Sequence, residues 1–149
     1  MPHNHNNCIE QALITAEALC QSHNQRLTKV RRRALELIWQ NHRPLGAYQL
    51  LAKLAEEGFN SAPPTVYRAL DFLLKAGLIH KVESMNAYLG CAHADKAHNG
   101  YFLICDTCHN VMEFDYQDVH KVLVANAAQH GFKLRSNTIE LTGLCQSCQ

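Results

Sequence analysis

The chain lacks the two features that would place it in a membrane or mark it for export. No apolar stretch approaches the length of about 18 residues that a membrane-spanning helix needs. Residues 1–7 are polar, and no basic segment there is followed by an apolar one, so they do not resemble a secretory signal. We therefore expect a cytoplasmic protein whose thiols stay reduced.

The chain also has little net charge. Its 149 residues carry a formal charge of +1 and give an isoelectric point near 7.7, so a nucleic-acid-binding surface would have to be a local basic patch. Hydrophobic residues make up 47%, which permits a real core and excludes global disorder. The length allows one domain or two small ones.

Cysteine and histidine, in contrast, are plentiful, with seven and ten residues respectively. Four of the cysteines form two Cys-x-x-Cys pairs, Cys105/Cys108 and Cys145/Cys148, which can supply the four thiolates of a tetrahedral zinc site. Two disulfides are the first alternative, and a reducing compartment argues against them. A redox Cys-x-x-Cys is the second, but it needs only one pair. We expect Cys8 and Cys20 to be half-buried helix residues.

The first half of the chain is expected to be mainly helical. Apolar residues recur at helical spacing over residues 8–24, 28–41 and from 47 onward, with Thr28 as an N-cap and Gly58 as a stop. Pro63 and Pro64 begin a further helix that ends at Gly77. Residues 78–83 and 87–89 then predict a β-hairpin. Helices followed by a hairpin are typical of a winged helix, whose last helix enters the DNA major groove.

The helix after the two prolines carries the candidate DNA contacts. An arginine can bind guanine bidentately, and a tyrosine can pack on a thymine methyl group or bind a phosphate. Solvated helix faces commonly carry the same residue types, so the composition alone does not decide. We predict base contacts from Tyr67 and Arg68, supported by Thr65, and phosphate contacts from Arg31, Arg32 and Lys81.

The second half predicts a small three-stranded domain with one helix. Strands are expected at 100–105 and 110–115, joined through the first Cys-x-x-Cys turn, and a last strand at 132–142 with a bulge near Ser136 and Asn137. The helix, at about 116–130, should pack its apolar face inward. That face consists of Val119, Val122, Leu123 and Ala127. A domain this small needs a zinc ion, a dimer partner or both.

Several motifs resemble the ferric uptake regulator (Fur) family of bacterial metal-sensing repressors, over residue 8 to the C-terminus. They are Arg26-Leu27-Thr28, the segment from Pro63 to Leu70, the two Cys-x-x-Cys pairs, and His130-Gly131-Phe132. Residues 71–74 and 80–84 are most similar to the zinc-sensing members. The resemblance implies a cytoplasmic bacterial homodimer that binds an inverted-repeat operator when it is loaded with metal, and that represses zinc-uptake genes.

The resemblance also implies a second, regulatory zinc site made by His80, Cys91, His98 and Glu113. A soft thiolate beside imidazoles favours zinc over iron or manganese. The sequence departs from the family at Lys29-Val30, where Pro-Gln is common, and it lacks the His/Asp run that iron-sensing members carry before the first Cys-x-x-Cys. His93, Asp95, His120 and His130 stay open as ligands of a further site.

These inferences combine into one prediction of class α+β. A winged-helix DNA-binding domain (1–89) is followed by a hinge with metal ligands (90–99) and a zinc-stapled, three-stranded dimerisation domain (100–149). We expect two zinc ions per chain, one structural and one regulatory, with no membrane and no small organic ligand. The rivals are an iron, manganese or peroxide sensor on the same scaffold, a zinc enzyme and a thiol redox switch; we expect no enzyme, because no nucleophile or general base is evident.

Overall fold

The computed structural model describes residues 5–41, 43–59, 62–96, 98–114, 117–135 and 138–149, and it divides into two units, 1–97 and 98–149. Helices dominate the first unit, and a sheet dominates the second, so the predicted α+β class is confirmed. Within the described residues no helix is long and apolar enough to cross a membrane.

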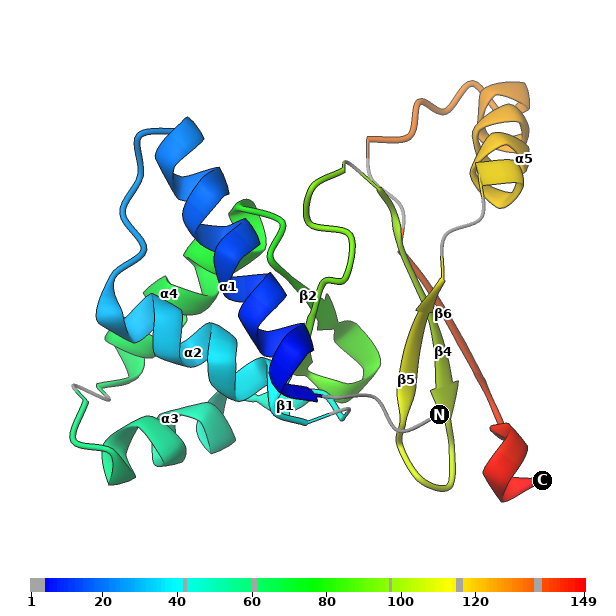
Figure 1. Cartoon of the computed structure of the whole chain (residues 1–149). Helices are drawn as coiled ribbons and strands as arrows, with labels where there is room; N and C mark the ends of the chain where they lie inside the picture. The colour runs from blue at the N-terminus through cyan, green and yellow to red at the C-terminus, as the bar shows by residue number, and fades with distance from the viewer. Residues whose placement is uncertain (1–4, 42, 60–61, 97, 115–116, 136–137) are drawn as a thin grey trace. The chain divides into compact units, whose positions relative to one another are not determined.

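The described part of the first unit contains four α-helices and a small sheet, as Figure 1 shows in blue to green. The helices are α1 (His5–Ser22), α2 (Lys29–Trp39), α3 (Ala47–Glu56) and α4 (Pro63–Lys75). The strands β1 (Leu45–Gly46), β2 (Ile79–Val82) and β3 (Ala87–Gly90) pair antiparallel in the order β1-β3-β2, and a 3-10 turn, η1 (Glu83–Met85), joins β2 to β3. The predicted winged-helix arrangement is confirmed; two-residue β1 was too short to predict.

The ends of these helices follow from the sequence. Thr28 caps α2 by accepting a hydrogen bond from the Arg31 N–H at 3.3 Å. Pro63 stands at the start of α4, where its missing N–H costs no hydrogen bond. Gly58 and Gly77 follow α3 and α4 with φ of +79° and +71°, a conformation that side chains disfavour. All four boundary residues were predicted for these roles.

The apolar stripes of α2, α3 and α4 meet in one core. The largest side chains that are less than 2% exposed there include Leu35, Ile38, Leu50, Leu54, Leu70 and Leu73. They lie at the 3.6-residue spacing that predicted the helices. The hairpin closes the core with Ile79 from β2 and Tyr88 from β3. The first unit thus buries its own hydrophobic surface.

The second unit is a three-stranded sheet with one helix. It contains β4 (Gly100–Cys105), β5 (Val111–Phe114), α5 (Gln117–Gln129), β6 (Thr138–Gly143) and a short turn, η2 (Gln146–Cys148). The strand order is β5-β4-β6, with β4 antiparallel to β5 and parallel to β6. The predicted bulge at Ser136 and Asn137 lies outside the described residues.

The prediction that α5 packs inward is wrong for the described chain. α5 buries none of its side chains, and Val122 is 60% exposed. Figure 1 shows the helix beyond the end of the β4–β5–β6 sheet rather than on its face. The apolar periodicity of a helix says that one face needs a covering surface, but it does not say which surface covers it.

Candidate metal centres

The first candidate centre is formed by the two Cys-x-x-Cys pairs, both in the second unit. Parallel pairing of β4 with β6 places Cys105 opposite Gly143, so both pairs follow the same end of the sheet. The four sulfur atoms lie within 4.8 Å of one another, and Cys108 Sγ is 3.7 Å from Cys145 Sγ. Tetrahedral zinc–thiolate bonds of about 2.3 Å place sulfurs roughly 3.8 Å apart, whereas a disulfide needs about 2.05 Å. The arrangement fits a zinc ion and not a disulfide.

The backbone around this cluster favours thiolate at one sulfur. Hydrogen bonds from the backbone N–H groups of Cys108 and Cys145 lower the pKa of the Cys105 thiol to about 6; the Cys145 N–H lies 3.4 Å from Cys105 Sγ. Cys148 is affected in the opposite sense, because its hydrogen bond to Cys145 and burial raise its pKa to about 12. Binding of a cation would therefore release protons from the cluster.

Two further candidate ligands lie together in the first unit. His80 is on β2 and Cys91 follows β3, and antiparallel pairing of the strands sets His80 opposite Leu89. Their ligand atoms lie within 4.8 Å of each other. The Cys91 backbone is held by a 3.0 Å hydrogen bond from its N–H to the Leu78 carbonyl, and its side chain is buried. This pair offers one sulfur and one nitrogen.

The second unit supplies a matching pair. His98 precedes β4, and Glu113 lies on β5 opposite Phe102. The His98 Nε2 atom is 2.7 Å from Glu113 Oε1. Two potential ligand atoms this close to each other can bind one cation together. This pair offers one nitrogen and one oxygen.

Other candidate ligands are not gathered in this way. Among the described residues, no cluster of three or more potential metal ligands includes His93, Asp95, His120 or His130. The structure therefore adds no support for a further metal site at these residues, which the sequence had left open.

The predicted base-contacting side chains are exposed on α4. Tyr67 is 46% exposed, and Arg68 is exposed with its Nε donating to the Pro64 carbonyl at 3.2 Å. Thr65 is half-buried one turn earlier in the helix. The sequence analysis overlooked Tyr48, the second residue of α3, which is 77% exposed. A tyrosine outside the Leu50–Leu54 stripe was the available signal for it.

The three predicted phosphate contacts already have partners within the first unit. Arg31 stacks over the Phe72 ring, 3.7 Å from its centroid, and donates to the Arg26 carbonyl. Arg32 pairs with Glu17 and lies 3.5 Å from Glu36. Lys81 Nζ is 3.1 Å from Glu83. Each would have to share or exchange its partner to hold a phosphate, so these assignments stay predictions.

Known proteins resemble the chain in sequence and in fold. The model of the ferric uptake regulator family matches residues 22–142. The chain belongs to this family. It is 43% identical to the zinc uptake regulation protein of Escherichia coli K12 over 140 residues, which is 93% of the chain and 82% of the relative.

Two solved structures of zinc regulators are similar throughout their length. A zinc uptake regulator complexed with zinc and DNA is 42% identical, with a TM-score of 0.89 over 94% of each chain. The holo form of XcZur is also 42% identical, with a TM-score of 0.84 over 91% of this chain and 95% of that one. The predicted family and fold class are confirmed, and these relatives are regulators, as expected for a chain that is not an enzyme.

Proposed function

We propose that the chain is a zinc-responsive transcriptional repressor that binds operator DNA and represses zinc-uptake genes. A zinc uptake regulator that was solved with zinc and DNA is similar over 94% of the chain, which supports this function. The single observation that carries the mechanism is the presence of two ready-made ligand pairs, one in each unit. Each pair has half of the ligands that a closed zinc site needs.

The two pairs define the regulatory site of the proposal. His80 and Cys91 supply nitrogen and sulfur, and His98 and Glu113 supply nitrogen and oxygen; the thiolate makes the set better suited to zinc than to iron or manganese. A bound zinc ion would supply a bond between the two units. The free energy of zinc binding then favours the one arrangement in which all four ligands meet, which is the differential contact that a switch needs.

A second zinc ion has a structural role in the proposal. The four cysteines hold the ends of β4 and β6 together, and thereby fix β5 and Glu113 in register. Structural zinc contributes directly to folding free energy. The chain would accordingly take up two zinc ions, one at each centre.

The partner of the second unit is a second copy of this chain. Leu103 on β4 lies opposite both Met112 on β5 and Leu141 on β6, and these three side chains are 43%, 65% and 50% exposed. Val122 on α5 is 60% exposed as well, and monomers rarely expose this much apolar surface. A symmetric dimer covers the same surface on both copies and spaces two α4 helices for an inverted-repeat operator.

The test compares Cys91→Ser with the wild type and with Cys8→Ser, which changes a half-buried thiol in the same unit. The probe is a DNA duplex selected from a random pool by the zinc-loaded wild-type protein. We expect Cys91→Ser to remain a folded dimer with one zinc per chain and to lose zinc-dependent DNA binding, while Cys8→Ser keeps it. Tight, zinc-dependent binding by Cys91→Ser would contradict the site, and a preference for iron or manganese would contradict the metal.

A further inference from the structure

The backbone beside Cys91 has no room for a side chain. A Cβ atom built on Gly90 would lie 2.3 Å from Cε2 and 2.5 Å from Nε1 of Trp39. Non-bonded carbon atoms prefer separations of about 3.5–4.0 Å, so the indole is in direct contact with the Gly90 backbone. The ring is rigid and cannot bend away at its tip. Glycine is needed at this position because of the close approach and not because of a turn.

This contact completes the support of Cys91. Gly90 is the last residue of β3 and pairs with Ile79, and the Cys91 N–H binds the Leu78 carbonyl. The strand pairing fixes the segment within the plane of the sheet. The Trp39 indole packs against the Gly90 backbone from α2, of which Trp39 is the last residue. Trp39 is half-buried, and its Nε1 atom is buried without a hydrogen-bond partner in the described part of the chain.

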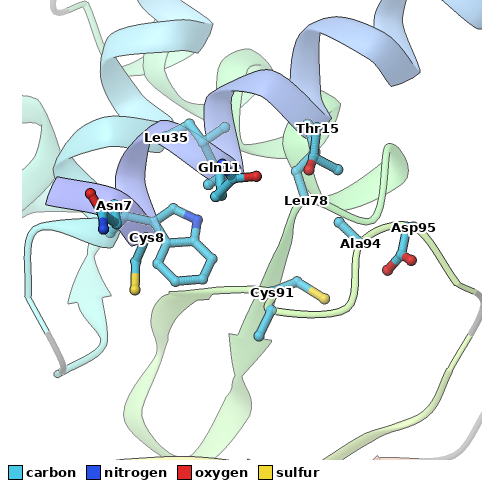
Figure 2. Close-up of a pocket in the computed structure, with 12 residues that line it drawn as sticks. Asn7, Cys8, Gln11, Thr15, Leu35, Leu78, Cys91, Ala94 and Asp95 are labelled. Atoms are coloured by element: carbon cyan, nitrogen blue, oxygen red, sulfur yellow. The ribbon is translucent and has the colours of Figure 1, made fainter. Parts of the chain in front are cut away.

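A cavity beside Cys91 makes the contact between Gly90 and the Trp39 indole important for this segment. A cavity of about 330 Å3 borders the segment, and Figure 2 shows side chains that line it from the chain segments around it. Its lining includes Cys8, Leu35, Trp39, Leu78, Cys91 and Asp95. Close packing therefore does not enclose Cys91 on every side. Loss of the indole would join the vacated space to this cavity and leave the Cys91 backbone with strand pairing alone.

We propose that Trp39 is a positioning residue for the regulatory zinc site, holding Cys91 beside His80 through its contact with Gly90. The inference rests on the proposed function, because it concerns the same ligand pair. It also ties the site to α2, the helix that carries Arg31 and Arg32. Removal of groups that orient a metal ligand typically lowers metal affinity about 10- to 100-fold.

The first test measures zinc affinity by competition with a chelator in the full-length dimer. Trp39→Ala should weaken the regulatory zinc at least about tenfold, while the four-cysteine zinc is retained. Leu35→Ala is the matched control, since Leu35 is a fully buried cavity-lining residue on the same helix and the atoms nearest to the Gly90 Cβ position belong to Trp39 instead. It should lower the unfolding temperature without changing regulatory zinc affinity in the folded protein. Equal weakening by both variants would mean a general structural role and would overturn the proposal.

A double-mutant cycle makes the test specific to the contact. Gly90→Ala alone should also weaken the regulatory zinc, because the new methyl group displaces either the indole or Cys91. With Trp39→Ala present, the same methyl group enters vacated space. Its effect on zinc affinity should then be at least about threefold smaller than in the wild type. Residues in contact show such non-additive effects, and distant residues do not. Purely additive losses would contradict the proposal.

Fluorescence gives a readout that is independent of DNA binding. Trp39 is the only tryptophan, so its emission reports on this contact directly. Emission should change as the regulatory site fills in the wild type and should not change in Cys91→Ser. A wild type that takes up no regulatory zinc would overturn the proposed function. If the wild type, Trp39→Ala and Gly90→Ala all bind the regulatory zinc with the same affinity, only the role of Trp39 is overturned.

Discussion

The two units of this chain differ in how they obtain a core. In the first unit, four helices and a hairpin enclose a continuous set of buried side chains, most of them leucine, isoleucine, valine and alanine. In the second unit, the described side chains that are buried all belong to one strand, β4, and include Tyr101, Phe102 and Ile104. The first unit can therefore be stabilised by its own hydrophobic contacts, whereas the second depends on what it binds.

This difference assigns separate work to the two units. A self-supporting winged helix can move as a body without losing its shape. In the proposed function, zinc and a second copy of the chain hold the second unit, which would give the dimer a fixed centre. The proposed regulatory ligands come from both units, so the metal would act on the connection between the units rather than on either fold.

Removal of a structural zinc ligand should have the largest effect, and it should affect the second unit far more than the first. Structural zinc sites contribute about 10–16 kcal/mol of apparent binding free energy, so Cys105→Ser should unfold the second unit and abolish dimerisation. The first unit should keep its helices, which circular dichroism and limited proteolysis would show. Cys8→Ser serves as the control. A folded dimeric Cys105→Ser protein with no bound metal would show that the second unit needs no zinc.

A charge on the exposed apolar row should have the next largest effect. Met112 is 65% exposed in the chain, and burying the exposed part of such a side chain stabilises by about 1–2 kcal/mol. A symmetric dimer loses this contribution from both copies, so Met112→Lys should weaken the dimer roughly 30- to 700-fold. Sedimentation equilibrium measures this. Thr142→Lys, at an exposed position next to Leu141 on β6, is the control. If Met112→Lys has the same dimer dissociation constant as the wild type, the interface lies elsewhere.

The smallest effect concerns an ion pair that joins α2 to the end of α3. Hydrogen bonds of 2.6 and 2.7 Å from the Arg33 guanidinium lower the pKa of the Glu57 carboxyl. Because the folded pKa lies below the unfolded one, the pair stabilises above the unfolded pKa, and this contribution is lost as the pH falls through the folded pKa.

Glu57→Gln should therefore lower the unfolding temperature slightly at neutral pH and remove part of the acid sensitivity of the first unit, with a smaller difference in high salt. Thermal unfolding followed between neutral pH and the carboxyl range, near about pH 4.3, measures it. An unchanged difference between the two proteins across this range would mean that the pair does not titrate as described.

Much of the first unit could be predicted because its signals are local. Thr28, Pro63, Gly58 and Gly77 mark helix ends through the backbone conformations they favour or the hydrogen bonds they make. The inward face of α5 was predicted wrongly because Val122 needs a surface that the described chain does not supply. The contact of Trp39 with Gly90 was not predicted, since the two residues are distant in sequence and only the packing of α2 against β3 brings them together.

The candidate ligands likewise divide into those with a local sequence signal and those brought together only by folding. Spacing predicted the four cysteines, because a Cys-x-x-Cys turn is itself a local motif. His80, Cys91, His98 and Glu113 came from resemblance to a family, and no spacing rule would have paired His80 with Cys91 or His98 with Glu113. Strand pairing does so, and it is a property of the folded chain.

The central claim is that a second zinc ion joins the two units and thereby permits DNA binding. The most direct measurement is binding of the selected duplex against buffered free zinc, with the zinc content per chain counted at every point. The account predicts that a dimer with one zinc per chain binds weakly, and that tight binding appears as the content rises from one to two. Tight binding at one zinc per chain, unchanged by the second, would contradict it.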